Sequence, residues 1–500
     1  MSDAITPSTF TMVGEVETRY QSYNIEMAEV TGGTFWKPYT EAQRAGTEPV
    51  LLTRNPLAGH DAGEASGFAD NDSLMAPLPP VDLTGARIRT LAAALGPVYL
   101  RVSGSWASHT YFDADGSSNG TCPDGYAAVL TRAQWDGVVD FAKAADALLV
   151  TSMANTDGAH DESGAWNPMN SRAFLEYSRD CGLPVTAAEF MNEPDVAALL
   201  GAPKGYTAVD YGRDVRIFAK MLHEVAPDAA LIGPGCAIGG DAPMLPGGIS
   251  IPTLATDDLL AEAATPPAIF SYHHYYGLSE RGGGMGHVPA EYVLTEEYLA
   301  ATDRTLASYR SARDRFAPDA PFWLTETGDA AMGGNTWAPT WLDTPRYIDQ
   351  LGRLARQGVT SVMHNTLCAS DYALLDARTH LPRAKYWAAL LWARLMGTTV
   401  YDAGLPLREG LHLYAHSRRD GDGYALVAIN TNREATTNIE LPTDFECYQL
   451  TGDELRGQTV RCNGEILSMI DDSTLPEISG RPMPAGTMAL PPVSITFITI

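Results

Sequence analysis

The chain has 500 residues, of which 45% are hydrophobic and 19% are charged, and its formal net charge at pH 7 is −27. An excess of acidic groups on this scale argues against nucleic acid and anionic membrane surfaces as partners, because both require a basic face. No apolar run reaches the roughly 18 residues of a membrane-spanning helix, so the composition describes a globular protein and leaves its oligomeric state open.

Short apolar runs rich in β-branched and aromatic residues begin at residue 19 and recur along most of the chain. Helical patterns, with apolar residues at three- and four-residue spacing, separate most of them. The runs that we predict as strands are 19–27, 96–104, 146–155, 183–192, 229–235, 268–276, 321–327 and 360–367. Such alternation, with no glycine-rich first turn, favours a (β/α)8 TIM barrel over residues 18–396 rather than a doubly wound sheet.

The pattern changes after residue 396. Short alternating strands separated by Gly, Asn, Asp and Pro follow over residues 397–500, which is typical of an antiparallel β-sandwich. We predict that one or more strands in residues 1–17 join this sandwich, and that the turn-rich stretch 55–80 is a long loop after the first barrel strand. The predicted fold class is α/β, a TIM barrel with an accompanying β-sandwich domain built mainly from the C-terminus.

Two glutamates end predicted strands after similar hydrophobic approaches. Glu193 lies in AAEFMNEPD (187–195) at the end of the fourth run, and Glu326 lies in PFWLTETGD (321–329) at the end of the seventh. The carboxyl ends of barrel strands form one mouth, where TIM-barrel enzymes carry their active sites. In glycoside hydrolysis one carboxyl group protonates the leaving oxygen and the other attacks or stabilises the anomeric carbon. We therefore interpret the pair as catalytic.

Four stretches carry a resemblance to a known family: LRVSGS (100–105), EFMNEPD (189–195), SYHHYYG (271–277) and LTETGDAAMGG (324–334). They resemble the clan of retaining glycosidases whose acid/base and nucleophile are glutamates at the ends of strands four and seven. Within that clan the chain is most similar to glycoside hydrolase family 79, the β-glucuronidases and heparanases. The likeness extends to the last helix and the closing strands, so it covers nearly the whole chain.

The resemblance implies a role for each residue of the site. Glu193 would be the acid/base and Glu326 the nucleophile of a double displacement through a glycosyl-enzyme. Asn192 would bind the 2-hydroxyl of the sugar, and Tyr275 would donate to the nucleophile and hold it ionised. The implied substrate-binding residues are Asn192, Glu26, Ser105, His273, Tyr275, Gly333, Gly334 and Asn365.

The expected specificity for a uronic acid depends on the two glycines after the nucleophile. By the resemblance, the backbone N–H groups of Gly333 and Gly334 would bind a uronic carboxylate, so the expected partner is a glucuronide or another saccharide that contains glucuronic acid. The better-known members have a Tyr directly before these glycines, whereas this chain has Met332. The acidic composition favours exo-cleavage of a small β-linked glucuronide, and an endo-acting, heparanase-like enzyme on heparan sulfate is the alternative.

Two further alternatives stay open. Met332 motivates a neutral-sugar β-glycosidase on the same scaffold, and the other is a carbohydrate-binding protein that has lost catalysis, although both glutamates are retained. A retaining enzyme needs no cofactor and no metal, and it predicts carboxyl groups roughly 5–5.5 Å apart rather than ~6.5–9.5 Å. Because the acid/base must start protonated, we expect a raised pKa for Glu193 and an ionised Glu326.

Three neighbours of the catalytic motifs invite other interpretations. Glu189, four residues before Glu193, is interpreted as a paired structural acid, with a supporting role at the site as the alternative. His273 and His274 are adjacent on a predicted strand and face opposite ways, so they cannot easily share a metal ion. We therefore predict no metal site.

Cysteine usage and the first residues bear on the compartment. The six cysteines are widely spaced and form no CxxC pair, which favours reduced thiols over a disulfide framework or a zinc site. Residues 1–16 contain neither the basic segment nor the apolar core of a signal peptide, so we expect a cytoplasmic location. A secreted or periplasmic protein whose leader has been removed is the alternative.

Overall fold

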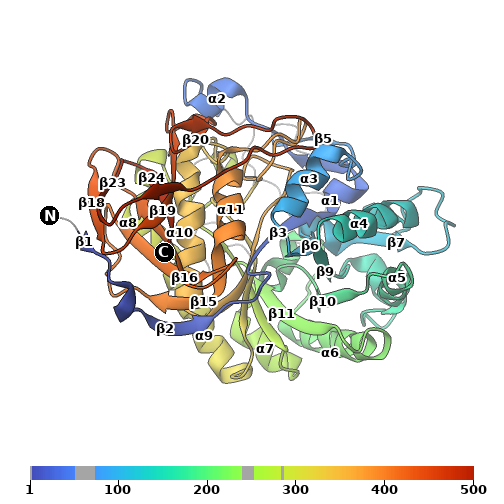
Figure 1. Cartoon of the computed structure of the whole chain (residues 1–500). Coiled ribbons are helices and arrows are strands. Elements are labelled where there is room, and N and C mark those ends of the chain that lie inside the picture. The colour runs from blue at the N-terminus through green and yellow to red at the C-terminus, as the bar shows by residue number, and fades with distance from the viewer. Residues whose placement is uncertain (1–2, 51–73, 239–252, 283–285) are drawn as a thin grey trace.

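A closed barrel of eight parallel strands forms the centre of the protein (Figure 1). The computed structural model describes residues 3–50, 74–238, 253–282 and 286–500. The barrel strands are β3 (Gln21–Glu26), β6 (Val98–Ser103), β9 (Ala147–Ser152), β10 (Val185–Glu189), β11 (Ala230–Cys236), β12 (Ile269–Tyr275), β13 (Phe322–Gly328) and β14 (Val359–His364). Each pairs with the next along the chain, and β14 closes the barrel onto β3. The predicted TIM barrel and its eight strands are confirmed.

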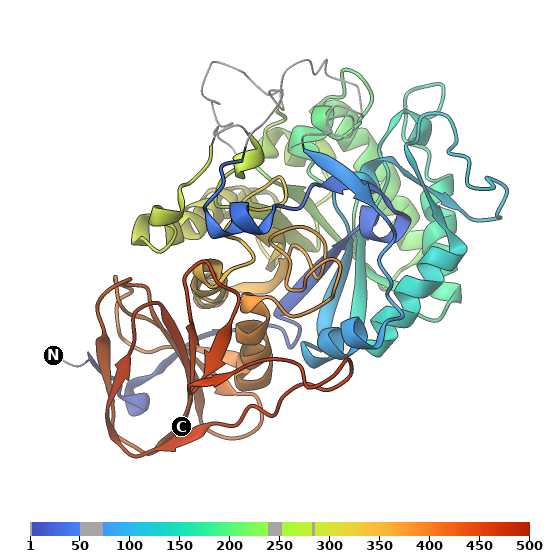
Figure 2. The same ribbon diagram turned by 90° about the horizontal axis from the view of Figure 1, so that it is seen from above.

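Helices surround the barrel strands (Figure 2). They are α3 (Ala86–Ala94), α4 (Arg132–Ala144), α5 (Met169–Asp180), α6 (Ala208–Val225), α7 (Thr256–Ala263), α9 (Ala301–Phe316), α10 (Thr344–Arg356) and α11 (Ala384–Leu395). α4 begins at a capping box in which Thr131 and Gln134 satisfy each other's backbone N–H groups. The sequence pattern did not predict α7, whose 8 residues hold too few turns to show a period. Within the described ranges, no helix has the length and apolar content to span a membrane.

Packed side chains fill the N-terminal end of the barrel. The buried cluster there consists of Tyr99, Val150, Ala187, Ile232, Trp323 and Met363, which come from six different barrel strands. Glu17 accepts hydrogen bonds from the Tyr99 hydroxyl at 2.6 Å and from Trp323 Nε1 at 2.7 Å. Side chains that fill this end make it a packed core, as is usual in TIM barrels, and leave the opposite end for the polar groups.

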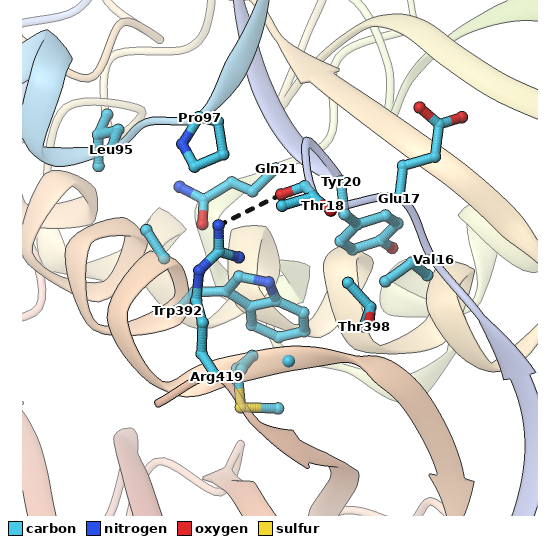
Figure 3. A pocket seen from close by; sticks show the side chains of 13 residues that line it. Val16, Glu17, Thr18, Tyr20, Gln21, Leu95, Pro97, Trp392, Thr398 and Arg419 are labelled. Atoms are coloured by element: carbon cyan, nitrogen blue, oxygen red, sulfur yellow. Dashed lines mark hydrogen bonds between the residues drawn. The ribbon is translucent and has the colours of Figure 1, made fainter. Parts of the chain in front are cut away.

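A small pocket lies beside this closed end (Figure 3). Its lining includes Glu17 and Gln21 near the start of β3, Trp392 of α11, and Arg419, whose guanidinium donates to the backbone oxygen of Thr18 at 3.4 Å. None of the predicted site residues lines this pocket, so it is separate from the candidate active site.

Two further sheets use strands from both ends of the chain, and both labelled termini lie on that side of the molecule (Figure 2). The larger sheet has the order β2 (Thr11–Glu15), β15 (Met396–Asp402), β16 (His412–Arg418), β17 (Tyr424–Asn430), β24 (Ser494–Thr499), β19 (Phe445–Gly452), β20 (Val460–Cys462) and β21 (Glu465–Ile466), with β22 (Arg481–Met483) paired to β19. The smaller sheet has the order β1 (Asp3–Ala4), β18 (Thr437–Leu441) and β23 (Gly486–Leu490). A separate buried cluster that includes Leu413, Ile439 and Ile498 contains side chains from both sheets. The domain boundaries at residues 17 and 396 stay predictions.

The excursion after β3 holds more regular structure than a loop. Within the described residues it contains α1 (Met27–Thr31), β4 (Gly33–Trp36), α2 (Glu41–Ala45) and β5 (Met75–Leu78), and β4 pairs antiparallel with β5. The prediction of a loop through residue 80 is therefore wrong at β5. The earlier part of that prediction, residues 55–73, lies outside the described residues.

A buried ion cluster joins the barrel to the larger sheet. Asp349 Oδ1, on α10, accepts from the Tyr414 hydroxyl at 2.6 Å and lies 2.5 Å from His412 Nδ1, and both partners belong to β16. Arg353, one helical turn further on, donates to Asp349 at 2.7 Å and to both carboxylate oxygens of Glu296 at 2.7 Å. Burial disfavours the charged imidazole, but the neighbouring carboxylate of Asp349 prevails and the pKa of His412 is raised to about 9.

We expect this cluster to make stability depend on pH. Because the folded-state pKa of His412 lies above its usual value near 6.5, its stabilisation is full below about pH 6.5 and is lost as the pH rises through about 9. Between about pH 6 and pH 9.5 the free energy of unfolding of the wild type should fall by on the order of 3 kcal/mol through this residue, as measured by urea unfolding. His412→Asn should lack this decrease. His416→Asn is the control, because burial lowers the pKa of His416 to about 4 and its charge does not change in this range. An unaltered pH dependence in His412→Asn would contradict the assignment.

Candidate active site

Glu193 lies just beyond the end of β10 in an unusual backbone conformation. Its φ of 46° and ψ of 62° fall in the left-handed region, and Pro194 then begins a 3-10 helix (Pro194–Leu199). A non-glycine residue in this region is strained, and such strain is frequent at functional sites. In this conformation Glu193 Oε1 lies 2.9 Å from His273 Nδ1 on β12.

Glu326 lies on β13 and receives donors from other strands. The Tyr275 hydroxyl donates to Oε1 at 2.7 Å, and Arg101 Nη1 donates to Oε2 at 2.9 Å. Asn365 Nδ2, just after β14, lies 3.5 Å from Oε1. Both oxygens of the buried side chain therefore face hydrogen-bond donors, which stabilise a negative charge there.

The two glutamates face each other. One oxygen of Glu193, one of Glu326 and a ring nitrogen of His273 all lie within 4.8 Å of one another. Oxygens this close fit the ~5–5.5 Å between the carboxyl groups of retaining glycosidases better than the ~6.5–9.5 Å of inverting ones. The same three atoms could in principle ligate a metal ion, but the guanidinium of Arg101 already places a positive charge 2.9 Å from Glu326 Oε2 and disfavours a cation there.

Arg101, on β6, connects the site residues to one another. Its side chain is 1% exposed. Nε and Nη2 donate to Glu189 Oε2 at 3.3 and 2.9 Å, and Nη2 also donates to Asn192 Oδ1 at 2.7 Å. Burial alone would favour the neutral guanidine, but the carboxylates of Glu189 and Glu326 prevail and raise the pKa of Arg101 above its usual value. Glu189 is thus a buried acid paired with Arg101.

His273 is buried, and its two ring nitrogens have different partners. Nε2 lies 3.3 Å from Arg101 Nη2, which can only donate, so Nε2 accepts and Nδ1 carries the proton. Nδ1–H therefore donates to Glu193 Oε1. Burial lowers the pKa of His273, which keeps the ring neutral. His274 lies on the other side of the strand, where its ring centroid is 4.6 Å from that of Tyr276.

The surroundings of Glu193 favour its protonated form. Burial raises its pKa to about 7; the charge of Arg101 opposes this shift and that of Glu189 adds to it. Because His273 donates to Oε1, Oε2 is the oxygen that can carry the proton. Such a group can give and take a proton near neutral pH, as a general acid/base must.

Glu26 and Asn365 form a second polar group beside Glu326. Glu26 Oε1 accepts from Asn365 Nδ2 at 3.0 Å, whereas Glu26 Oε2 is buried and has no partner among the described residues. Asn365 Nδ2 also lies 3.0 Å from the hydroxyls of Tyr275 and Tyr372. Burial and then the charge of Glu326 raise the pKa of Glu26 well above its usual value. Glu26 can therefore present an O–H donor at the barrel mouth.

Asn192 and Ser105 complete the carboxyl ends of the strands. Asn192 Oδ1 is occupied by Arg101, while its buried Nδ2 has no acceptor within the described part of the chain. That amide is therefore a donor without a protein partner. Ser105 begins a 3-10 helix (Ser105–His109) directly after β6 and is half-buried.

The turn after Glu326 carries the two predicted carboxylate-binding glycines. Met332, Gly333 and Gly334 have φ of 65°, 82° and 83°. The Gly334 N–H donates to the backbone oxygen of Ala330 at 3.2 Å and is therefore engaged within the protein. No acceptor for the Gly333 N–H occurs among the described residues. Of the two predicted donors, only the Gly333 N–H has no acceptor among residues 3–50, 74–238, 253–282 and 286–500.

Arg281 holds this turn through its backbone. Nη1 donates to the carbonyl oxygens of Met332 at 3.1 Å and Gly334 at 2.9 Å, and Nη2 donates to Asp371 Oδ2 at 2.8 Å. The guanidinium also lies 3.8 Å from the ring centroid of Tyr39. The turn is thus fixed by contacts to its main chain that do not depend on the side chain at position 332.

The sequence analysis missed Arg101, Tyr372 and Arg281. Arg101 had a detectable signal, because a charged residue inside the apolar strand VYLRVS requires a buried counter-charge. Tyr372 lies in a connection and Arg281 in a short 3-10 helix (Glu280–Gly282), and in neither does the sequence pattern indicate which way the side chain points.

Fold and site together define a class of protein: a TIM barrel with two facing carboxyl groups at the ends of strands four and seven is the architecture of a retaining glycoside hydrolase. The sequence profile of "Glycosyl hydrolase family 79, N-terminal domain" matches residues 80–352. The chain belongs to glycoside hydrolase family 79, and the predicted family is confirmed.

Several named proteins have similar sequences. Heparanase-like protein 1 of Arabidopsis thaliana is 26% identical in an alignment that covers 72% of this chain and 67% of that protein. Baicalin-beta-D-glucuronidase of Scutellaria baicalensis is 26% identical in an alignment that covers 63% of this chain and 59% of that protein. Heparanase of Mus musculus is 26% identical in an alignment that covers 91% of this chain and 94% of that protein. The match to the Scutellaria enzyme therefore spans less than two thirds of its length.

Solved structures share the fold. A 4-O-alpha-L-rhamnosyl-beta-D-glucuronidase from Fusarium oxysporum superposes with a TM-score of 0.66 over 100% of both chains, at 14% identity. The family 51 alpha-L-arabinofuranosidase AbfB from Bifidobacterium longum superposes with a TM-score of 0.62 over 100% of this chain and 99% of that one, at 12% identity. At these identities the likeness establishes the architecture alone.

We expect Gly104→Ala to disrupt the site through Glu26. Gly104 has φ +84° and a Cβ there would lie 1.5 Å from Glu26 Oε2, so the carboxyl group must move. Activity should fall at least about tenfold because the carboxyl group is displaced. With a ψ of −178°, Gly104 also occupies a backbone region essentially restricted to glycine, so the free energy of unfolding should fall as well. Gly116→Ala is the control for a Cβ added at positive φ, because its φ is +77° and nothing lies within 4 Å of that Cβ. Equal activity and thermal midpoints in the two variants would refute the role of this contact.

Proposed function

We propose that the protein is a retaining exo-β-glucuronidase in which Glu326 is the nucleophile and Glu193 the acid/base. The observation that carries this proposal is the approach of their carboxyl oxygens to within 4.8 Å, in unlike surroundings. Glu326 receives donors from Arg101 and Tyr275, whereas Glu193 has a pKa raised to about 7. Two carboxyl groups whose environments differ in this way divide the acid and nucleophile roles.

The reaction proceeds in two displacements. In the first, an oxygen of Glu326 bonds to the anomeric carbon as the bond to the leaving oxygen breaks, and Glu193 gives its proton to that oxygen. In the second, water attacks the anomeric carbon, Glu193 takes its proton, and Glu326 leaves as a carboxylate. The free Nδ2 of Asn192 is available to the 2-hydroxyl beside the reacting carbon.

The proposed substrate is a small β-linked glucuronide. One sequence relative supports a glucuronide substrate by its name, baicalin-beta-D-glucuronidase. The Gly333 N–H supports it as a backbone donor that has no acceptor in the described part of the chain. The net charge of −27 disfavours a long polyanion. An endo-acting, heparanase-like enzyme is the second candidate, favoured by the 94% coverage of mouse heparanase.

Hydrolysis of p-nitrophenyl β-D-glucuronide, beside the β-D-glucoside and β-D-xyloside, tests the proposal. We expect cleavage of the glucuronide, with a loss of at least about 1,000-fold in Glu326→Gln because the nucleophile is removed. Turnover of a neutral glycoside alone would overturn the uronic acid assignment. Cleavage of heparan sulfate to internal fragments, without action on the small glucuronide, would favour the endo-acting candidate. Sugar binding without turnover would favour a protein that has lost catalysis.

The pH dependence provides a second test. Because Glu193 must be protonated for the first displacement, kcat/KM should fall as the pH rises through about 7. In Glu193→Gln the residual activity should lack this alkaline limb, since the titrating group is gone. The measurement is kcat/KM from about pH 4 to pH 9, and a limb that persists unchanged in the variant would assign it to another residue.

A further inference from the structure

Glu189 is the last residue of β10, and both of its carboxylate oxygens are occupied by the protein. Oε2 accepts from Arg101 Nε and Nη2 at 3.3 and 2.9 Å. Oε1 accepts from Ser271 Oγ at 2.9 Å and from Thr325 Oγ1 at 3.0 Å. The side chain is 1% exposed. Glu189 therefore cannot bind the sugar, and any effect it has on the reaction passes through its neighbours.

A glycine on a neighbouring strand leaves room for the Glu189 carboxylate. Gly235, on β11, has φ +70°, and a Cβ there would lie 2.9 Å from Glu189 Oε1. Strands β6, β11, β12 and β13 thus all contribute to the place where Glu189 lies. A carboxylate held on so many sides gives its partner Arg101 a fixed orientation.

Arg101 divides its donors between Glu189 and the catalytic residues. One edge of the guanidinium, Nε and Nη2, faces Glu189, which leaves Nη1 directed at Glu326 Oε2 at 2.9 Å. Nη2 also reaches Asn192 Oδ1 at 2.7 Å. Movement of Glu189 would therefore move the donors that hold Glu326 and Asn192.

Glu189 also contributes to the charge around Glu193. The titratable and charged groups that face Glu193 from the surrounding elements are Arg101, Glu189, Asp195, Cys236, His273, Tyr275 and Glu326. His273 is neutral, Arg101 favours the ionised form of Glu193, and Glu189 favours the protonated form. Without Glu189 the positive charge of Arg101 is less compensated, and Glu193 holds its proton less strongly.

We propose that Glu189 is a positioning residue for both catalytic carboxyl groups. It fixes Arg101 against Glu326 and Asn192, and it supplies a negative charge that favours the protonated form of Glu193. The inference rests on the proposed catalytic roles of Glu193 and Glu326, and it does not depend on which sugar is cleaved.

The experiment compares Glu189→Gln with the wild type over the full pH profile, using the p-nitrophenyl glycoside that the wild type cleaves. We expect kcat to fall on the order of tenfold and the alkaline limb of kcat/KM to move to lower pH by on the order of one unit, because a negative charge near Glu193 is lost. A residue with a merely structural role would leave the limb in place. An unmoved limb in folded Glu189→Gln therefore overturns the proposal.

Two further variants separate charge from geometry. Glu189→Asp keeps the charge but retracts it, so the limb should stay near its wild-type position while kcat still falls. If kcat in Glu189→Asp equals that of the wild type, the proposal that Glu189 positions Arg101 is wrong. This measurement also tests the proposal if Glu189→Gln does not fold. Asp214→Asn on α6 is the matched control, because this buried acid accepts from Arg213 at 2.6 Å and contacts neither catalytic glutamate in the described residues. It should change thermal stability alone.

A spectroscopic readout keeps this proposal distinct from the proposed function. If the wild type cleaves no glycoside, the carboxylic-acid infrared band of Glu193, assigned by its loss in Glu193→Gln, is titrated in the wild type and in Glu189→Gln. Its midpoint should still be lower in Glu189→Gln. Equal titration midpoints of Glu193 in the wild type and in Glu189→Gln would overturn the inference about Glu189. This result would not depend on whether the protein is a glucuronidase.

Discussion

One buried guanidinium underlies the arrangement of the site. Arg101 lies between Glu189 and Glu326, and it also binds Asn192 and contacts His273. Acidic side chains gathered in a water-poor barrel would repel one another, and a buried charge left without a partner costs several kcal/mol. The positive charge therefore allows the carboxyl groups to lie together at one mouth of the barrel. The fixed orientation of the guanidinium sets the positions of its partners. The strained turn at Glu193 brings the remaining carboxyl group to this cluster.

The barrel could be predicted because its strands follow a simple rule. Strands of a parallel barrel are buried on both faces and therefore appear as near-continuous apolar runs. β6 and β13, for example, are buried at every position. Shorter elements escape this signal: α7 has too few residues to show a period, and β4 and β5 form a hairpin across a long insertion. Their formation depends on tertiary contacts that a local pattern does not contain.

The site was predicted where residues end barrel strands, because strand ends converge whatever the side-chain details. Glu26, Tyr275, Glu326 and Asn365 meet in this way. The partners of each side chain could not be predicted, since they depend on the stagger between strands and on the path of the connecting loops. Arg101 on β6 donates to Glu326 on β13, and Arg281 reaches the turn at Met332 from a short 3-10 helix. The engagement of the Gly334 N–H likewise follows from the shape of its turn.

The pairing of early and late strands imposes an order on the making of the protein. β1 and β2 find their partners in β18 and β15, which leave the ribosome only after the whole barrel has been synthesised. During that interval their backbone groups have no sheet to join, and β2 carries the exposed apolar side chains Met12 and Val13. The companion sheets can therefore be completed only after every barrel strand has been synthesised, which makes their closure a late step of biosynthesis.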